Sequence, residues 1–505
     1  MLITVEDLMA FHRCRRLPYL ERHGPQTEKL DANDLILQLR WEREQLRQQI
    51  QQGLPGIVLE RQVSSRPPLS LTEISDLEAA TQAQMALAEE HIYRGQLRGQ
   101  ILEEETVAVV VKPDLLLRQT WIDGSTYYIP VEIRTGKRLK SEYELALALQ
   151  ALVLGTHQPI SPSWGYVVLR DGRWQEVQLR KRFAQVLNLL QDFLEVVADA
   201  VMPQVYMARS RCGLCHWREF CRQQAAHTDP LTLLPGVTGS RHPILQTAGI
   251  HSIEALAATA PEDLQAVPGL GAKVALQLVR QAQATVEQRA IWLDRINLHP
   301  LPAAGVELFF DIEADPQHDV SYLLGVLVVD QQQRTSRYQA CMATDPAEEA
   351  LNWFQFLDLV DSYPDAPIFH FHAFEIHTCR KLAERHRSGL RRLKQLLSRF
   401  VDLHEFITRH LVLPIESYSL KHIARWMGFE WRQSNASGAQ SIYWYSQWLQ
   451  TGDPSFLELL TTYNEDDCQA TLHLKQWLAT QLQQQRSTTP ESDFPLFLPP
   501  KAMGR

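Results

Sequence analysis

Two short motifs in the C-terminal third of the sequence place acidic side chains where they could hold divalent metal ions. Asp311 and Glu313 end the apolar segment FFDIEA, and alternation along a strand would put both side chains on one face. Tyr463 and Asp467 lie four residues apart in TTYNEDDCQATLHL, so on a helix they would share a face. Carboxylates gathered in this way can hold metals beside a phosphate, and Tyr463 could orient a water. The residues therefore predict a metal-dependent site for phosphodiester cleavage.

The order of these motifs resembles that of the DEDD exonucleases of the RNase H-like fold, in the subclass with tyrosine in its third motif. Asp311-Ile-Glu313 matches the first motif, and Tyr463-Asn-Glu-Asp-Asp467 matches the third. Where the family has an Asp in its second motif, PIFHFHAFEIHTCRKL offers Glu375. The resemblance implies that Asp311, Glu313, Glu375 and Asp467 hold Mg²⁺ or Mn²⁺ and that Tyr463 positions the attacking water.

Each of these motifs also has an ordinary structural explanation. An Asp-x-Glu pair on a strand is common, and Tyr-x-x-x-Asp often only decorates a helix. Asp402, in VDLHEF, could cap a helix or pair with His404. A catalytically inactive relative of the exonucleases is therefore the alternative to an active one.

A cluster of cysteines in the N-terminal half predicts a second metal centre. Cys212, Cys215 and Cys221 are close enough in sequence to chelate one centre, and the distant Cys14 is a candidate fourth ligand. Thiolates select zinc or an iron–sulfur cluster, and the spacing leaves both open. We expect the seven cysteines of the chain to be thiols or metal ligands rather than disulfides.

The segment between these cysteines carries a further pair of acidic residues. VVVKPDLLL and YYIPVEIRTGKRLK predict two strands with Asp114 and Glu132, and SEYELALALQALVLG predicts a helix with Gln150. Ser141 and Glu144 have the spacing of a capping box at the start of that helix. Two acidic residues on adjacent strands beside a cation could form another metal-dependent hydrolytic site.

This arrangement resembles the RecB-like branch of the PD-(D/E)XK nucleases, in some of which four cysteines around the core bind a [4Fe–4S] cluster. The resemblance implies cluster ligands at Cys14, Cys212, Cys215 and Cys221, with zinc as the alternative. It also implies metal ligands at Asp114 and Glu132, the motif Gln at Gln150, and an early acidic residue at Glu44. The family's Glu-x-Lys is Glu132-Ile-Arg134 here, and an arginine cannot replace a tunable lysine. The activity of this domain is therefore open, and the cluster could serve only to join the two ends of the domain.

A glycine-rich turn between these two blocks suggests contact with nucleic acid. AVPGLGAKVALQLVRQA resembles a helix-hairpin-helix, and LLPGVTGSRHPILQTAG offers a degenerate partner hairpin. Gly269 and Gly271 would present backbone N–H groups to a phosphate, with Lys273 close by. Such hairpins bind duplex DNA without reading its sequence. The alternative is a tight turn between two packed helices.

These motifs fit an α/β multidomain protein, and 505 residues predict two to four domains. We expect a restriction-endonuclease-like (RecB-type) α/β domain at residues 1–228 and a small helix-hairpin-helix domain at 229–295. An RNase H-like α/β exonuclease domain is expected at 304–482, and its alternation of strands and helices fits that class. Residues 483–505, rich in proline and polar side chains, predict a flexible tail.

Composition agrees with an ordinary globular protein, since 45% of the residues are hydrophobic and 22% are charged. No apolar run approaches the roughly 20 residues that a membrane helix needs. The start, MLITVEDLMAFHRC, lacks the pattern of a signal peptide, so we expect a cytoplasmic protein with no membrane partner. A net charge of −9 argues against a broadly basic surface but allows a local basic groove for nucleic acid.

The order of the blocks resembles that of bacterial RecB-family nucleases of unassigned pathway. The resemblance predicts 3′→5′ hydrolysis of single-stranded or frayed DNA in repair or DNA processing, with Mg²⁺ or Mn²⁺. One alternative is a DNA-binding or repair scaffold whose nuclease domains have decayed, which the departures at Glu375 and Arg134 favour. Another is an RNA exonuclease. The sequence does not identify a helicase or repair partner.

Overall fold

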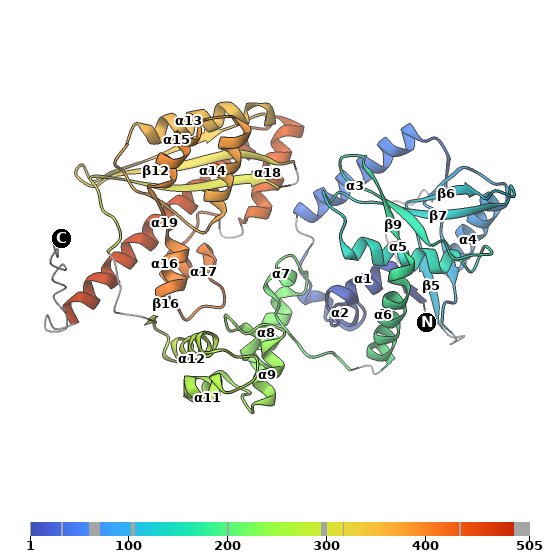
Figure 1. The fold of residues 1–505 in the computed structure, drawn as a ribbon, viewed down its shortest axis with the longest axis horizontal. Helices are drawn as coiled ribbons and strands as arrows, with labels where there is room; N and C mark the ends of the chain where they lie inside the picture. The colour runs from blue at the N-terminus through green and yellow to red at the C-terminus, as the bar shows by residue number, and fades with distance from the viewer. Residues whose placement is uncertain are drawn as a thin grey trace, which may run out of the picture. The chain divides into compact units, whose positions relative to one another are not determined.

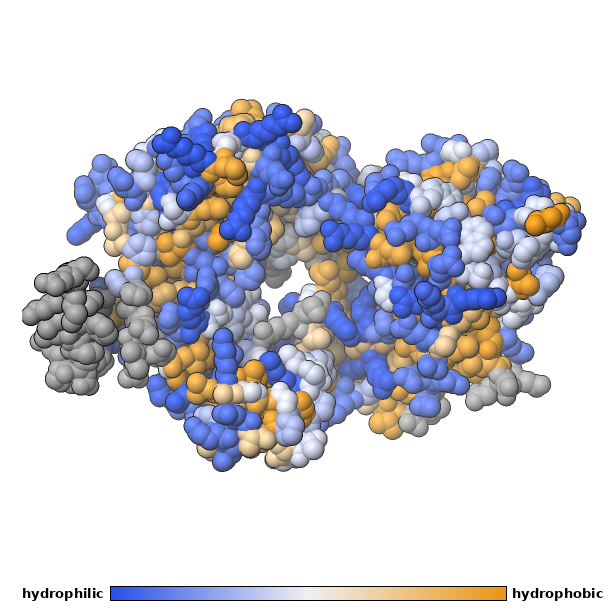
Figure 2. All heavy atoms as spheres, in the orientation of Figure 1, coloured by the Kyte–Doolittle hydropathy of each residue, from blue (hydrophilic) through white to orange (hydrophobic). Residues whose placement is uncertain are grey.

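A computed structural model describes residues 2–31, 34–59, 71–102, 107–198, 201–293, 300–316, 318–433 and 436–488. The chain forms two compact units, Met1–Asp229 and Pro230–Arg505. The predicted hairpin block and the predicted exonuclease block therefore lie in one unit. Hydrophilic side chains cover most of the face seen in Figure 2, with apolar ones in scattered patches. Within the described ranges, no helix combines the length and apolarity needed to cross a membrane.

The first unit is built on a six-stranded mixed sheet with the order β2-β3-β6-β7-β8-β9, next to a three-stranded sheet with the order β1-β5-β4 (Figure 1). The strands are β1 (Leu2–Thr4), β2 (Ile57–Val58), β3 (His91–Tyr93), β4 (Leu97–Gly99), β5 (Ala108–Val111), β6 (Leu115–Thr120), β7 (Thr126–Ile133), β8 (Trp164–Val168) and β9 (Trp174–Gln178). The helices are α1 (Val5–Arg13), α2 (Leu17–His23), α3 (Asp34–Gly53), α4 (Leu71–Ala86), α5 (Ser141–Leu154), α6 (Arg180–Ala198), α7 (Arg209–Cys212) and α8 (Arg218–Thr228).

Helix α5 is the centre of this unit. It is apolar on all sides, as expected of a helix surrounded by other elements, and Gln150 is a buried polar residue on it. The predicted start at Ser141 is confirmed, but the predicted capping box is wrong. The N-cap is Lys140, no side chain caps the helix, and Glu144 forms an ion pair with Arg182 instead.

The second unit begins with the small helices of the hairpin block. These are α9 (Arg241–Thr247), α10 (Ile253–Ala258), α11 (Pro261–Gln265) and α12 (Ala272–Glu287). Strand β10 (Ile291–Trp292) then pairs with β16 (Leu411–Val412) of the following α/β block. The Gln281 side chain of α12 donates to the carbonyl oxygen of Leu413 at 2.6 Å and accepts from the Tyr418 hydroxyl at 2.8 Å. These contacts explain why the two blocks form one unit.

The α/β block is a five-stranded sheet with the order β13-β12-β11-β14-β15 between two layers of helices (Figure 1). Its strands are β11 (Val306–Asp315), β12 (Val320–Asp330), β13 (Thr335–Met342), β14 (Ile368–His370) and β15 (Phe400–Asp402). Its helices are α13 (Glu349–Asp361), α14 (Phe374–Arg385), α15 (Leu390–Leu397), α16 (Leu403–His410), α17 (Leu420–Trp426), α18 (Gly438–Thr451) and α19 (Ser455–Thr488). The first three strands are antiparallel, and β14 and β15 run parallel to β11.

Strand β11 divides its side chains between the two helical layers. Leu308 and Phe310 pack in the core that includes Trp353 of α13, whereas Phe309 packs in the core that includes Leu474 of α19. The alternation places odd-numbered residues of β11 on the α19 side. Helix α19 continues to Thr488, so the predicted flexible tail is wrong for residues 483–488, and residues 489–505 lie outside the described ranges.

A glycine in β12 allows α19 to approach the sheet. Gly325 pairs with Asp311 in the antiparallel ladder. A Cβ atom at Gly325 would lie 1.6 Å from Oδ1 of Asn464 and 2.6 Å from the hydroxyl oxygen of Tyr338. Because Asn464 belongs to α19, this absence of a side chain sets the distance between the helix and the strand that carries Asp311.

We predict that Gly325→Ala lowers the free energy of unfolding by about 1–3 kcal/mol, the usual cost of overpacking a core. Urea unfolding followed by tryptophan fluorescence measures the change. Gly438→Ala is the matched control in the same unit, since a Cβ atom there would meet open space. Equal stability of the two variants would contradict this role for Gly325.

Candidate active site

Three carboxylates from β11 and α19 meet at one point of the second unit. The ligand atoms of Asp311, Glu313 and Asp467 all lie within 4.8 Å of one another. Among the described residues, this is the only such group of three or more potential metal ligands. Asp311 is partly exposed, whereas Glu313 and Asp467 are buried. The two motifs, about 150 residues apart in the chain, therefore come together, and we call this group the carboxylate cage.

The hydrogen-bond partners of the cage are neutral. Asn464 Nδ2 donates to Asp311 Oδ2 at 2.7 Å, Ser441 Oγ donates to Glu313 Oε2 at 2.5 Å, and Trp431 Nε1 donates to Asp467 Oδ1 at 2.7 Å. Lys421 is a nearby cation that lowers the pKa of both Glu313 and Asp467, but its ammonium binds the carbonyl oxygen of Ala436. Ionisation of all three carboxylates would thus leave an excess of negative charge that this one lysine does not compensate.

The pKa values show this imbalance directly. Burial and then the charge of Asp467 raise the pKa of Glu313 to about 8, and burial raises the pKa of Asp467 to about 6. Burial and then the charge of Asp467 also raise the pKa of Asp311 well above its ordinary value. Oxygen ligands gathered without a positive partner are what Mg²⁺ and Mn²⁺ prefer. The donor set of the cage therefore fits a divalent cation.

Tyr463 lies one turn before Asp467 on α19 and is also buried. Burial and the neighbouring carboxylates raise the pKa of its hydroxyl well above the ordinary value, so the hydroxyl keeps its proton. A hydrogen bond from this hydroxyl lowers the pKa of Asp467. The Lys421 ammonium lies 4.8 Å from the centre of the Tyr463 ring and 5.6 Å from the centre of the Trp431 ring.

The structure does not bring Glu375 into the cage. The Glu375 side chain is buried on α14, and its Oε2 lies 3.5 Å from Nδ1 of His370. Burial raises the pKa of Glu375, and the Glu375 charge in turn raises the pKa of Asp311. The structure confirms the cap expected of Asp402, which begins α16 and accepts from the backbone N–H of His404 at 2.9 Å.

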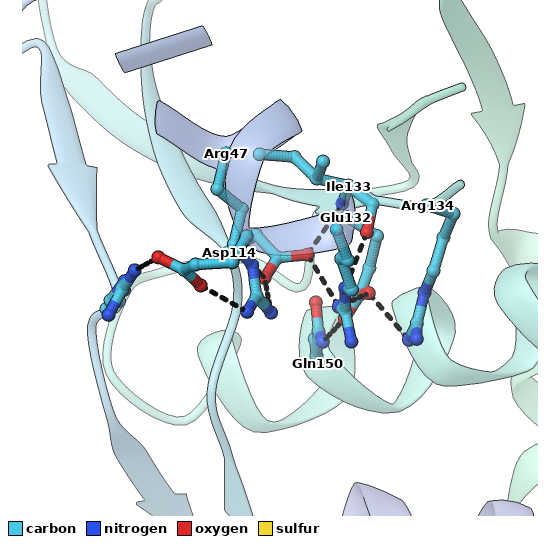
Figure 3. A network of polar contacts seen from close by, with 9 residues as sticks. Arg47, Asp114, Glu132, Ile133, Arg134 and Gln150 are labelled. Atoms are coloured by element: carbon cyan, nitrogen blue, oxygen red, sulfur yellow. Dashed lines mark hydrogen bonds and ion pairs between the residues drawn. The ribbon is translucent and has the colours of Figure 1, made fainter. Parts of the chain in front are cut away.

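The acidic pair of the first unit has different surroundings. Asp114 precedes β6, Glu132 lies in β7, and both are buried. Gln150 of α5 donates to Glu132, so the three residues lie together as predicted (Figure 3). Here, however, the partners of the carboxylates include arginines. Glu44 lies outside this pair and forms ion pairs with Arg47 and Arg94.

The four cysteines of the predicted second metal centre come together in the first unit. The charge of Cys14 raises the pKa of Cys212, Cys215 and Cys221, which requires Cys14 to lie near all three of them. Burial, the largest cause, raises the pKa of Cys212 and Cys215 and raises that of Cys221 to about 11. Among the described residues, no three of these sulfur atoms lie within 4.8 Å of one another.

The predicted DNA-binding turn joins α11 to α12. Gly269 has a φ of +92°, which glycine adopts without strain, and Gly271 is the N-cap of α12 with no side-chain cap. Lys273 is exposed in the first turn of the same helix. Gly236, in the predicted partner hairpin, has the same φ of +92°. Each of the two turns therefore has a glycine in the left-handed region of φ.

Sequence reasoning missed several residues around the cage. Asn464 adjoins Tyr463 in the third motif, and Lys421 lies in the segment SYSLKHIARWMGF, so both had a local signal. Trp431 and Ser441 had none, because only the folded chain brings them to Asp467 and Glu313.

Comparisons with known proteins support two of the predicted domains. Residues 308–479 match the model of the RNase_H superfamily, and residues 229–284 match the model of the SAM-like helix-hairpin-helix tandem. The protein thus has a multidomain α/β fold with an RNase H-like domain and a helix-hairpin-helix domain, as predicted, and this combination suggests a nuclease that processes nucleic acid.

The other comparisons add little. No curated protein matches the sequence. A solved structure titled "Crystal structure of SSO0001" is similar at 13% identity, over 44% of this chain and 86% of that chain, with a TM-score of 0.23. A likeness at this level carries no argument about fold or function.

We predict that the metal-free protein becomes less stable as pH rises from about 4 to about 8. The raised pKa values of Glu313 and Asp467 mean that the folded state holds protons which the unfolded state has released. Stability is therefore full below the ordinary carboxyl pKa and is lost as pH rises through the folded values. Thermal unfolding in EDTA across this pH range measures the loss.

Mn²⁺ competes with these protons, so its stabilising effect is predicted to be larger at pH 8 than at pH 5. A concentration one hundred times the Kd would add about 2.7 kcal/mol to the free energy of unfolding at pH 8. Asp467→Asn should remove most of this increment. An increment that is independent of pH, or larger at pH 5, would contradict the assignment.

Proposed function

We propose that the protein is a divalent-metal-dependent nuclease that hydrolyses phosphodiester bonds of DNA from the 3′ end, with its active site at the carboxylate cage. The observation that carries this proposal is the meeting of Asp311, Glu313 and Asp467 in an RNase H-like domain without a compensating ion pair. A site with two buried carboxylates, a third beside them and neutral hydrogen-bond partners is stable in its fully ionised form only when it holds a cation.

The residues around the cage would perform distinct tasks. Asp311, Glu313 and Asp467 would hold Mg²⁺ or Mn²⁺, and the bound cation would supply water activation and stabilisation of phosphate charge. The Tyr463 hydroxyl, which keeps its proton and donates a hydrogen bond to Asp467, could accept a hydrogen bond from the water and so orient it. Asn464, Ser441 and Trp431 fix the directions of the three carboxylates through the bonds described above. Glu375 would lie outside the cage, where its charge raises the pKa of Asp311 without adding a ligand.

The helix-hairpin-helix block would hold the nucleic acid. Gly269 and Gly271 are exposed and would present their backbone N–H groups to a phosphate, and Lys273 adds an exposed charge at the same turn. This contact reads phosphates rather than bases, which suits an exonuclease that must act on any sequence. DNA is the proposed substrate because such hairpins bind DNA duplexes, and RNA is the alternative that the assay below tests.

For the first unit we propose a RecB-like fold whose Cys14, Cys212, Cys215 and Cys221 bind a [4Fe–4S] cluster. The proximity of the four cysteines supports a shared metal centre, and the RecB-like resemblance favours the iron–sulfur cluster over zinc. Cys14 follows α1 and the other three lie near the C-terminal end of the unit, so the cluster would join its two ends.

Asp467→Ala is predicted to reduce the rate of nucleotide release by at least about 10³-fold, because the cage loses a carboxylate that would hold the catalytic cation. The assay uses 5′-labelled and 3′-labelled single strands of DNA, and RNA in parallel, with Mg²⁺ or Mn²⁺. Early release of a mononucleotide from the 3′-labelled strand supports 3′→5′ polarity.

Glu465→Gln is the matched control, since Glu465 lies on the same helix but forms an exposed ion pair with Arg432. Undiminished activity of Asp467→Ala would refute the assignment. Binding of DNA without nucleotide release from any strand, under either metal, would favour a decayed scaffold. Faster digestion of RNA than of DNA would replace the proposed substrate.

We predict that protein purified without oxygen is brown and has a broad absorption band in the visible blue, as iron–sulfur clusters do. Cys215→Ser should abolish the band and lower the melting temperature of the first unit. Cys341→Ser, at a buried cysteine of the second unit, is the control and should leave the spectrum unchanged. A colourless wild-type protein with one zinc ion would show that the zinc alternative holds.

A further inference from the structure

We propose that the acidic pair of the first unit is closed to metal ions because three arginines, Arg43, Arg47 and Arg134, take the place of the cation. The RecB-like resemblance implies a metal at Asp114 and Glu132, and the residues present do not fit one. The network would instead fasten helix α3 to the sheet. The chain would then have one hydrolytic centre, and this inference stands whether or not the carboxylate cage is active.

The acceptor sites of Asp114 are filled. Its Oδ1 accepts from Nε of Arg47 at 2.7 Å and also from Nη2 of Arg47. Its Oδ2 accepts from Nη2 of Arg43 at 2.8 Å and from the backbone N–H of Ile133 at 2.6 Å. A carboxylate offers about four lone-pair sites, and four donors use all of them. A metal ion could bind Asp114 only by displacing at least one of these donors.

Glu132 is almost as fully engaged (Figure 3). Its Oε1 accepts from the Gln150 side chain, and its Oε2 contacts Nη2 of Arg134 at 2.6 Å and Nη2 of Arg43 at 3.2 Å. Arg43 therefore bridges both carboxylates, at the position between them where a shared metal ion would have to lie. Arg134 stands where the family has its catalytic lysine, and its guanidinium also lies 5.3 Å from the centre of the Tyr143 ring.

The balance of charge between the arginines and the two carboxylates also argues against a bound metal ion. Three guanidinium groups against two carboxylates leave a net charge of at least +1, since burial raises the pKa of Glu132. Glu44, which pairs with Arg47, is itself paired with Arg94. Burial would raise the pKa of Asp114, but Arg43, Arg47 and Arg134 outweigh it and lower that pKa, so Asp114 is ionised and neutralised internally. A divalent cation would enter a centre that is already positive. The carboxylate cage of the second unit, in contrast, has an excess of negative charge.

The same contacts give the network a structural role. Arg43 and Arg47 lie four residues apart on α3, so both project from one face of the helix. Nε of Arg43 donates to the carbonyl oxygen of Ile133 in β7 at 2.8 Å, beside its bonds to Asp114 and Glu132. The rigid planar fork of arginine suits such simultaneous bonds, which a lysine could not reproduce. The arginines thus hold α3 against the start of β6 and the end of β7, where Asp114 and Ile133 lie.

The test counts the Mn²⁺ ions bound to the full-length protein by electron paramagnetic resonance, in the double variant Asp311→Asn/Asp467→Asn. These substitutions disable the cage and leave the first unit untouched. The expected result is no tightly bound Mn²⁺. Tight binding that disappears when Asp114→Asn is added would overturn the proposal. Nuclease activity is assayed separately on the wild type, so failure of the proposed function is distinguishable from failure of this inference.

A gain of binding provides the complementary test. Adding Arg43→Gln, Arg47→Gln and Arg134→Lys to the double variant should create one Mn²⁺ site that depends on Asp114. Continued absence of Mn²⁺ binding in a folded variant would show that the arginines are not what excludes the metal. If this variant does not fold, the melting temperature of the Asp114→Asn variant tests the proposal instead. The melting temperature should fall equally with Mn²⁺ and with EDTA, whereas a fall seen only with Mn²⁺ would contradict the proposal.

Discussion

The organisation of the second unit depends on one electrostatic constraint, the uncompensated charge of Asp311, Glu313 and Asp467. Burial raises the pKa of each carboxyl, and their fixed partners are neutral side chains. The fold maintains this unfavourable arrangement by packing apolar residues on both faces of β11. The absence of a side chain at Gly325 lets α19 approach β11 closely. The charge of the cage lowers the free energy of unfolding, and a bound cation would raise it again.

The two acidic centres of the chain show how neighbouring residues, rather than carboxylates alone, decide what a site can bind. Asp114 and Glu132 have the strand positions of metal ligands, yet their acceptor sites are filled by arginines and Gln150. The cage has a lysine nearby, but its ammonium binds the carbonyl oxygen of Ala436. The carboxylates of one centre are thus neutralised by its own arginines, and those of the other depend on an external cation. This contrast underlies the proposal of a single hydrolytic centre.

The residues of the carboxylate cage could be predicted from the sequence because local patterns place them together. Alternation in FFDIEA placed Asp311 and Glu313 on one face, and helical spacing placed Tyr463 with Asp467. The sequence could not show that Arg43 and Arg47 reach Asp114, about 70 residues away in the chain, because nothing local links α3 to β6. The capping box at Ser141 failed because Glu144 found a tertiary partner in Arg182. Glu375 has a plausible motif position, but its place outside the cage depends on packing beside His370.

Anomalous diffraction from a crystal of the full-length protein soaked in Mn²⁺ at pH 8 tests the central claim most directly. The charge balance predicts a manganese peak within bonding distance of Asp311, Glu313 and Asp467, and no peak between Asp114 and Glu132. A peak at the N-terminal pair with the arginines displaced, or an empty cage at a saturating concentration of Mn²⁺, would contradict it.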